Sequence, residues 1–168
     1  MKRILFPAVL ILQIVILGIL GLQYNLIDSY GQSFQVLTVH HQDYHPRGDN
    51  QAYQNYDINY IPSSKWDGSG DLSYRTPIYV LLEPGEDGVY QVVAASEEKM
   101  KVNKQQVLLR GNYSHYSKEK KEYTVYYGFE YIDNPKQYHI EHMNSKWKVS
   151  IQLAPWGQHK IIAIESVK

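Results

Sequence analysis

The feature that most constrains this chain is an uncharged, apolar run close to its N-terminus. Residues 4–22 contain no charged side chain, and fifteen of these nineteen residues are Ala, Val, Ile, Leu or Phe. A helix of that length measures about 28 Å, which is close to the hydrocarbon thickness of a lipid bilayer. The run therefore predicts one transmembrane helix, which pairs its own backbone polar groups inside the lipid.

Two other interpretations of this run stay open from the sequence. A buried core helix normally keeps a polar face, and residues 4–22 show none. A cleaved signal peptide normally has a shorter apolar run of about 7–15 residues with a small-residue cleavage site close behind it. The best such site, at residues 29–31, is distant from the run and matches poorly. An uncleaved anchor is the favoured interpretation.

Charges around the apolar run predict the orientation of the chain. Lys2 and Arg3 precede the run, and the next Lys or Arg is Arg47. Because basic residues stay on the cytoplasmic side, we expect a cytoplasmic N-terminus and a C-terminal domain outside the cell membrane. The expected parts are a transmembrane anchor (1–23), a linker (24–32) and an extracytoplasmic β domain (33–168).

The exported part has the pattern of an all-β domain. Short alternating or β-branched segments recur between turn signals, and no helix-length apolar repeat follows the linker. Val149, Ile151 and Leu153, for example, alternate with polar residues, as a half-buried strand requires. We expect about eight mainly antiparallel strands in a sandwich or barrel-like arrangement. Their expected positions are 33–41, 54–61, 77–83, 88–96, 105–111, 122–132, 146–153 and 158–166.

Composition argues against several classes of function. The chain has no Cys, which excludes disulfides, thiolate metal sites and a thiol nucleophile. Its 17 basic and 17 acidic residues balance, without the basic excess typical of a nucleic-acid-binding protein. A nucleophile elbow, a glycine-rich phosphate loop and a His-Glu-x-x-His motif are all missing from the sequence. We therefore predict a protein that is not an enzyme and has no cofactor.

Five of the seven histidines form two groups, at His40, His41 and His45 and at His139 and His142. Neighbours such as His40 and His41 point to opposite faces of a strand, so they cannot easily share a metal ion. A zinc site needs at least three well-placed ligands. We predict surface histidines and no metal site.

Two separated segments supply the candidate binding or structural site. Its residues are Arg47, Gly48, Asp49, Ile58, Tyr60, Tyr127, Gly128, Glu130 and Tyr131. An arginine can hold a carboxylate through two parallel hydrogen bonds, so Arg47 could pair with Asp49, Asp57 or Glu130. A glycine within a strand marks a bulge or a close backbone approach, the role expected of Gly128. We expect these residues to lock two strands together; a binding site, or a hydrolase that uses two of the carboxylates, is the alternative.

These segments resemble the motifs of the GDYXXLXY protein family, which consists of membrane-anchored bacterial proteins. Residues 47–49 (RGD) match the start of the naming motif, and residues 58–60 (INY) resemble its end. Asn50 stands where the family has Tyr and extra residues intervene, so this chain resembles a divergent member with a lengthened turn. Residues 127–131 (YGFEY) resemble a later strand of the family. The resemblance implies an extracytoplasmic β domain of unknown activity with a multi-span membrane partner.

Together these features predict a single-pass membrane protein whose exported domain acts by interaction, as a subunit of a membrane complex. The expected partners are the lipid bilayer, through residues 4–22, and a membrane protein, but not nucleic acid. The alternative is a module that binds cell-wall glycans, because exposed aromatic rings can stack on sugars. The aromatic candidates for this alternative are Tyr53, Tyr56, Trp66 and Tyr74.

Overall fold

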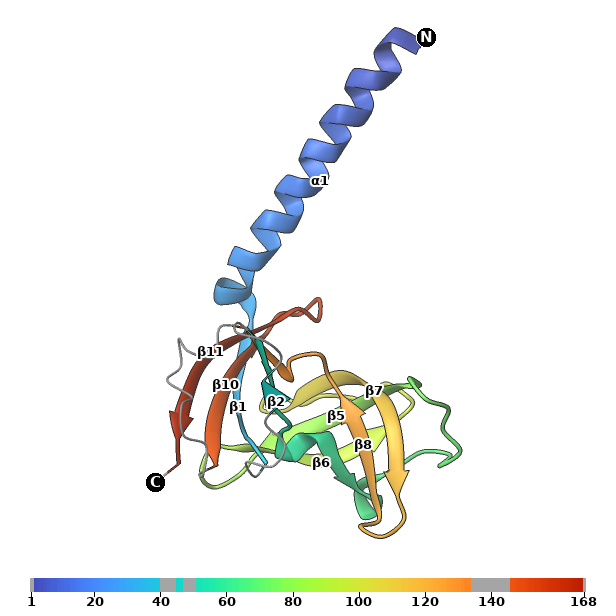
Figure 1. Ribbon diagram of the computed structural model, residues 1–168, viewed down its shortest axis with the longest axis vertical. Coiled ribbons are helices and arrows are strands. Elements are labelled where there is room, and N and C mark those ends of the chain that lie inside the picture. Colours follow the sequence, from blue (N-terminus) through green and yellow to red (C-terminus); the bar gives the residue numbers. More distant parts are fainter. Residues whose placement is uncertain (1, 40–44, 47–50, 134–145, 168) are drawn as a thin grey trace.

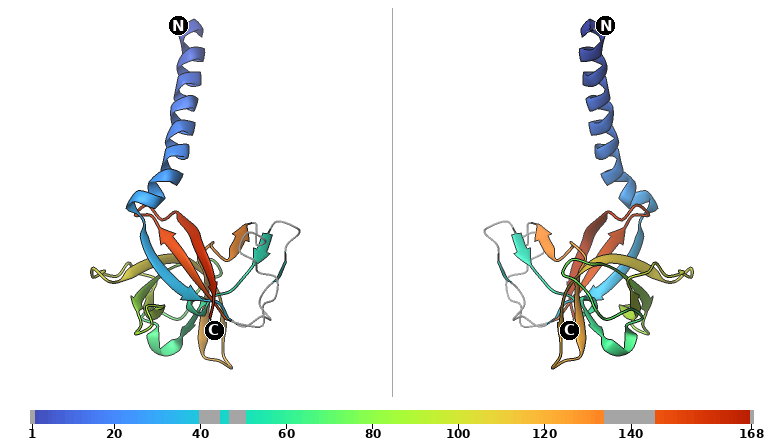
Figure 2. Two further views of the ribbon diagram at one scale, coloured as in Figure 1. Left: turned by 90° about the vertical axis from the view of Figure 1, so that its left-hand side faces the viewer. Right: turned by 90° about the vertical axis from the view of Figure 1, so that its right-hand side faces the viewer.

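A long N-terminal helix stands on a β domain in the computed structural model, which describes residues 2–39, 45–46, 51–133 and 146–167 (Figure 1). Helix α1 spans Lys2–Tyr30, so most of the segment expected to form a linker is helical. Figure 2 shows that α1 leaves the domain at the end where β1 begins. No helix formed by the described residues has both the length and the apolarity needed to cross a membrane.

The last turns of α1 are helical because they dock on the β domain. Ile27 is only 1% exposed, and the Asp28 carboxylate lies 3.0 Å from the Lys160 ammonium group. The Gln152 side chain donates a hydrogen bond to the Asp28 backbone carbonyl at 3.3 Å. An apolar contact, an ion pair and a hydrogen bond therefore fix the helix end to the domain.

The described residues of the domain form three sheets, within which all strand pairs are antiparallel. One sheet has the order β1-β10-β11, with strands Gln32–Leu37, Trp147–Leu153 and His159–Ser166. The largest has the order β4-β8-β7-β5-β6, with strands Tyr60–Pro62, Glu122–Tyr126, Val107–Ser117, Pro77–Pro84 and Tyr90–Ser96. The third has the order β2-β3-β9, with strands His45–Pro46, Gln51–Tyr53 and Tyr131–Asp133. The prediction of a mainly antiparallel all-β domain is confirmed.

The main core lies between the β1-β10-β11 sheet and the five-stranded sheet. Phe34 and Val149 enter it from the first sheet, and Val80 and Leu109 enter it from the second. Val149 and Ile151 are fully buried, as the sequence predicts, but the predicted half-buried alternation is wrong for the middle of β10, where residues 149–152 are all buried. The polar residues between and after them are buried as well, because the Gln35 side chain covers Ser150 and the end of α1 covers Gln152.

Two predicted strands differ from the structure. The segment 54–61 contains a 3₁₀ turn, Asp57–Asn59, and only its end belongs to strand β4. The segment 122–132 is divided into β8 and β9, with an irregular loop at residues 127–130 (hereafter the 127–130 loop). The turn and the loop contact each other around buried polar side chains, and these contacts replace the strand pairing that the sequence pattern suggested.

Candidate functional site

The predicted site residues fall into three groups in the structure. Arg47, Gly48 and Asp49 lie outside the described residues, so the pairing of Arg47 stays a prediction. Tyr60 and Tyr131 lie in strands β4 and β9, where they pair with Thr124 and Tyr53. The remaining residues gather around one buried carboxylate and are Ile58, Tyr127, Gly128 and Glu130.

Most of the histidines considered as metal ligands are not described by the structure: His40, His41, His139 and His142 lie outside the described residues. His45 begins strand β2. Within the described ranges, no group of three or more His, Asp or Glu side chains is placed to hold a metal ion.

Glu130 is the centre of the cluster, and its side chain is only 1% exposed. Its Oε1 accepts hydrogen bonds from the Tyr127 backbone N–H and from the Asn59 side-chain amide, both at 2.7 Å. Its Oε2 accepts a hydrogen bond from the Gly128 backbone N–H, also at 2.7 Å. Short hydrogen bonds from N–H groups stabilise a buried carboxylate in place of water. The arrangement holds the 127–130 loop against the Asp57–Asn59 turn.

Asn59 completes this polar cluster, and the sequence did not single it out as a site residue. It is fully buried, and its Oδ1 accepts a hydrogen bond from the Tyr56 backbone N–H at 2.6 Å. Its amide nitrogen donates both to Glu130 and to the Val125 carbonyl, each at 2.7 Å. The only sequence signal was a polar residue between two apolar ones, Ile58 and Tyr60.

The expected strand 122–132 breaks because Glu130 takes the backbone N–H groups of residues 127 and 128, which could otherwise pair with a neighbouring strand. Gly128 has φ +98°, a conformation that side-chain-bearing residues rarely adopt. The prediction of one continuous strand is therefore wrong, and so is the expectation that Gly128 marks a bulge or a close backbone approach within it: Gly128 lies in the 127–130 loop, and its positive φ is what favours glycine there.

The 127–130 loop carries an aromatic cluster between the two main sheets. The Tyr127 and Phe129 rings stack with centroids 5.3 Å apart, and the Phe129 ring also meets the His159 ring edge-on at 5.3 Å. The Tyr127 hydroxyl donates to the Ile58 carbonyl at 2.7 Å. Burial, followed by the charge of Glu130, raises the pKa of Tyr127 well above its usual value. Tyr127 is thus a neutral structural hydroxyl.

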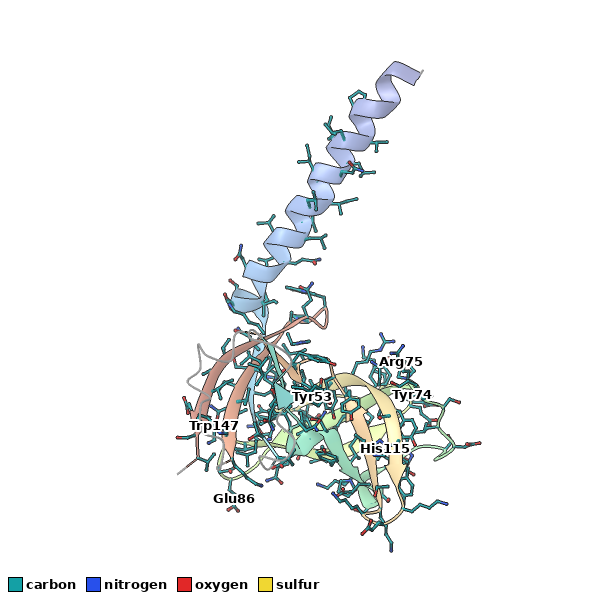
Figure 3. All side chains as sticks on the ribbon, viewed as in Figure 1. Tyr53, Tyr74, Arg75, Glu86, His115 and Trp147 are labelled. Carbon is teal, nitrogen blue, oxygen red and sulfur yellow. The ribbon has the colours of Figure 1, made fainter. Side chains whose placement is uncertain are left out.

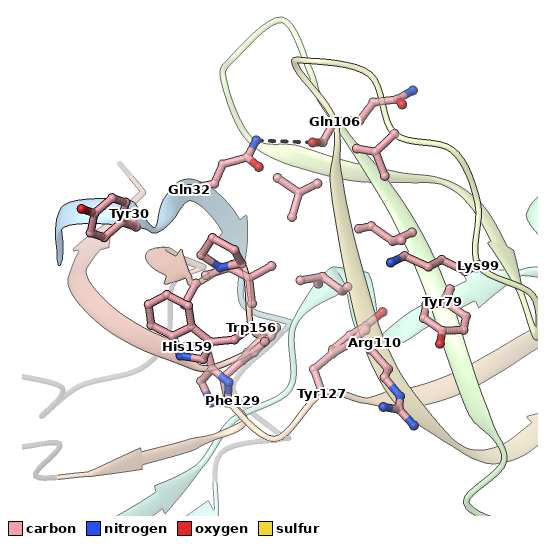
Figure 4. A pocket seen from close by; sticks show the side chains of 18 residues that line it. Tyr30, Gln32, Tyr79, Lys99, Gln106, Arg110, Tyr127, Phe129, Trp156 and His159 are labelled. Atoms are coloured by element: carbon pink, nitrogen blue, oxygen red, sulfur yellow. Dashed lines mark hydrogen bonds between the residues drawn. The ribbon is translucent and has the colours of Figure 1, made fainter. Parts of the chain in front are cut away.

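A cavity of about 630 Å³ opens beside this cluster, between the end of α1, strands β5 and β7 and the β10–β11 turn (Figure 4). Tyr127 and Phe129 line part of its wall, so the Glu130 cluster positions a surface of the cavity. Figure 4 shows Lys99, Tyr79 and Arg110 on one side of this space and Tyr30, Trp156 and His159 on the other. This cavity, which we call the helix-end pocket, is the site that the sequence did not reveal.

The described residues that line the helix-end pocket include basic groups and no acidic ones. The basic residues are Lys99, Arg110 and His159. Burial lowers the pKa of His159, and the charge of Glu130 opposes that effect. His159 therefore has less positive charge at neutral pH than an ordinary histidine, and Lys99 and Arg110 supply the charge of the pocket.

Of the carboxylates considered for a hydrolase, Asp49 lies outside the described residues, and Asp57 and Glu130 have separate surroundings. Glu130 is buried with its oxygens bonded to N–H donors. Asp57 lies 3.7 Å from the Lys146 ammonium group and lines a different groove. Burial raises the pKa of Asp57, and Lys146 opposes that rise. This geometry gives no support to a shared acid–base pair.

The aromatic candidates for glycan binding do not form one surface. Tyr56 is fully buried, so its prediction as an exposed ring is wrong. Trp66 stacks on Tyr123 with centroids 4.4 Å apart, and Tyr53 packs edge-on against neighbouring tyrosines. Tyr74 is 67% exposed, and Figure 3 shows it apart from Tyr53 and beside Arg75, whose guanidinium group lies over the Tyr74 ring. A row of sugar-stacking rings is not present among these candidates.

No family model, no curated protein and no solved structure matches this chain.

Proposed function

We propose that the protein is anchored in a lipid bilayer by α1 and that its β domain stands outside the cytoplasm and acts by binding a partner, without catalysis. The observation that carries the proposal is the apolar surface of the helix. Eleven large apolar side chains between Val9 and Leu22 are each 46–68% exposed. Transfer of one such side chain from water into an apolar medium is worth about 1.5–3 kcal/mol.

The sequence of the helix supports insertion along its whole apolar run. Residues 4–22 carry no charge, although the side chains of 4–6 and 8 lie outside the described residues. Exposed residues follow one another without interruption from Val9 to Leu22, and Gln13 is the one residue with a polar side chain among them, so the exposed surface of this segment is almost entirely apolar. A helix that is apolar on all sides needs a nonpolar surrounding.

Basic residues on only one side of this run give the proposed orientation. Lys2 and Arg3 remain in the cytoplasm, and the β domain lies on the other side. The docked end of α1 then holds the domain at a fixed place beside the membrane, with the helix-end pocket next to the anchor. We propose this pocket as the binding site.

The two segments that resemble the GDYXXLXY family contact each other through the hydrogen bond between Asn59 and Glu130. This contact supports the proposal that the chain is a divergent member of that family. It also gives the shared residues a structural task, which is to hold the wall of a binding pocket, and so favours an interaction subunit of a membrane complex.

Membrane extraction tests the anchor. We expect the full-length protein to stay in the membrane pellet after an alkaline carbonate wash and to dissolve only with detergent. Leu12→Lys combined with Ile16→Lys adds two charges to the proposed span, and each costs about 2.5–3.5 kcal/mol of insertion. This variant should move to the supernatant, whereas Ser29→Lys, which adds a charge beyond the apolar run, should remain in the pellet.

Two outcomes would refute the proposal. Wild-type protein of full length in the carbonate supernatant would exclude an anchor. A reporter fused to the C-terminus that is active only in the cytoplasm would exclude the proposed orientation. Gentle detergent extraction followed by affinity purification tests the partner, and recovery of the monomer alone would contradict the interaction role.

A further inference from the structure

The helix-end pocket lies beside the end of the apolar segment of α1. Tyr30, the last residue of the helix, lines the pocket. A neighbouring groove is lined by Leu20 and Ile27 of α1 together with residues 157–159 of the β10–β11 turn, and Gly157 and His159 line both spaces. The turn therefore runs alongside Leu20, which belongs to the apolar run. With α1 in a bilayer, the pocket opens at the membrane–water interface.

The aromatic residues at the mouth of the pocket suit that position. Tyr30 is 67% exposed and Trp156 is 42% exposed, although both are large rings. The Trp156 indole N–H donates to the Gln158 side chain at 2.8 Å, so one edge of the ring is polar and the other apolar. Tyr and Trp are enriched at the interface of membrane proteins for this reason. The pocket mouth has the composition of a surface that contacts lipid head groups.

Inside, the pocket combines cationic and apolar groups. Lys99 and Arg110 face it from one side, and in the described part of the chain no carboxylate pairs with either. The exposed apolar side chain of Val102 also lines the pocket. Residues 24–168 contain all 17 acidic residues but only fifteen of the 17 basic ones, so a cationic lining is not a general property of this domain. Glu83 accepts a hydrogen bond from the side chain of the lining residue Gln106, and Glu130 accepts one from the Gly128 N–H.

We propose that the helix-end pocket binds the anionic head group of a membrane lipid. Lys99 and Arg110 hold the phosphate through charge-assisted hydrogen bonds, and Val102 and Trp156 contact the apolar part of the same molecule. The ligand enters from the bilayer that holds α1, so this inference rests on the proposed function. Binding of a lipid there fixes the β domain against the membrane surface, ready to meet a membrane partner.

Native mass spectrometry of the full-length protein in neutral detergent tests this inference. The probes are phosphatidylglycerol and phosphatidylcholine with identical acyl chains. We expect phosphatidylglycerol to bind at least about tenfold more tightly than phosphatidylcholine, because only its head group carries net negative charge. Lys99→Gln combined with Arg110→Gln should weaken phosphatidylglycerol binding by about tenfold for each charge removed and leave phosphatidylcholine binding unchanged.

The matched control removes two charges at a distance from the pocket. Lys118 and Lys120 are exposed in the turn between β7 and β8, and Lys118→Gln with Lys120→Gln should bind phosphatidylglycerol as the wild type does. Trp156 fluorescence on addition of each lipid gives a second readout. An unchanged thermal unfolding temperature for all variants shows that a loss of binding is not a loss of fold.

Three outcomes would overturn the inference. Equal affinity of the wild type for the two lipids would exclude selection of the anionic head group. An equal loss of affinity for phosphatidylglycerol in the pocket variant and the control variant would exclude this pocket as the binding site. Displacement of phosphatidylglycerol by equimolar inorganic phosphate would identify a soluble anion as the ligand. The carbonate wash tests the membrane anchor independently of these three outcomes. If the wild type stays in the washed membrane, the anchor proposal stands even when the lipid-binding inference is refuted.

Discussion

Removal of the Glu130 carboxylate tests whether the buried polar cluster determines the shape of the domain. In Glu130→Ala, the backbone N–H groups of Tyr127 and Gly128 and one N–H of the Asn59 amide lose their acceptor, whereas the other Asn59 N–H keeps its bond to the Val125 carbonyl at 2.7 Å. Each buried donor left without a partner costs about 1–3 kcal/mol. The three donors predict a loss of about 4 kcal/mol in the free energy of unfolding, towards the low end of that range for each donor because the Tyr127 and Gly128 bonds are only partly buried.

Glu130→Gln gives a graded comparison. The Gln side-chain oxygen can still accept the two hydrogen bonds that Oε1 accepts. Its NH₂ group takes the place of Oε2 and cannot accept a hydrogen bond, so the Gly128 N–H loses its acceptor. We expect a loss of about 1–1.5 kcal/mol, a third of the effect of alanine, because one of the three bonds is lost. The control is Asp57→Ala, which removes a largely exposed ion pair with Lys146 and should cost about 0–1 kcal/mol.

Urea unfolding of the full-length protein in detergent, followed by tryptophan fluorescence, measures these differences. The expected order of destabilisation is Glu130→Ala, then Glu130→Gln, then Asp57→Ala. A free energy of unfolding for Glu130→Ala within about 0.5 kcal/mol of the wild-type value would show that the carboxylate does not stabilise the domain, because surface substitutions have effects of that size. An equal loss in Glu130→Gln and Glu130→Ala would show that the charge matters and the count of donors does not.

Three further predictions concern single residues. Burial raises the pKa of Tyr127 in the folded state, so the unfolded state loses its proton first and the free energy of unfolding should fall as the pH rises above about 10. Tyr127→Phe should make the free energy of unfolding depend less steeply on pH in this range, and an unchanged dependence would contradict the prediction. Burial lowers the pKa of His159, so the unfolded state gains its proton first and stability should fall as the pH drops below about 6.5. His159→Gln should make the free energy of unfolding fall less steeply at acid pH, and the same pH dependence in the variant and the wild type would exclude His159 as the cause. Gly128→Ala forces a side chain into φ +98° and should cost about 1–2 kcal/mol, whereas Gly21→Ala, with no atom near its new Cβ, should not lower the unfolding temperature.

The strand pattern shows where sequence reasoning succeeds. Val149 and Ile151 alternate with polar residues, and the structure buries both in the core as predicted. Six of the expected segments correspond to strands β1, β5, β6, β7, β10 and β11. Such strands are recognised because the two faces of a sheet have different surroundings, which leaves a period of two in the sequence.

The same reasoning fails where a side chain replaces the backbone as a hydrogen-bonding partner. Residues 122–132 have strand-like composition throughout, yet Glu130 binds two backbone N–H groups and breaks the strand. Tyr56 and Glu130 look like surface residues by type, and each is buried because a distant segment supplies its partners, Phe129 for the Tyr56 hydroxyl and Asn59 for the carboxylate. These contacts join residues about 70 positions apart.

The sequence by itself determined the apolar run of α1 and the antiparallel β character of the domain, because each depends on a local pattern of side chains. Only the tertiary structure decided that Asn59 and Glu130 meet, that α1 docks through Ile27 and Asp28, and that Lys99 and Arg110 share a pocket with Trp156. Each of these contacts joins residues that are far apart in the sequence. A local sequence pattern does not tell which distant segments become neighbours in space, so only the fold shows these contacts.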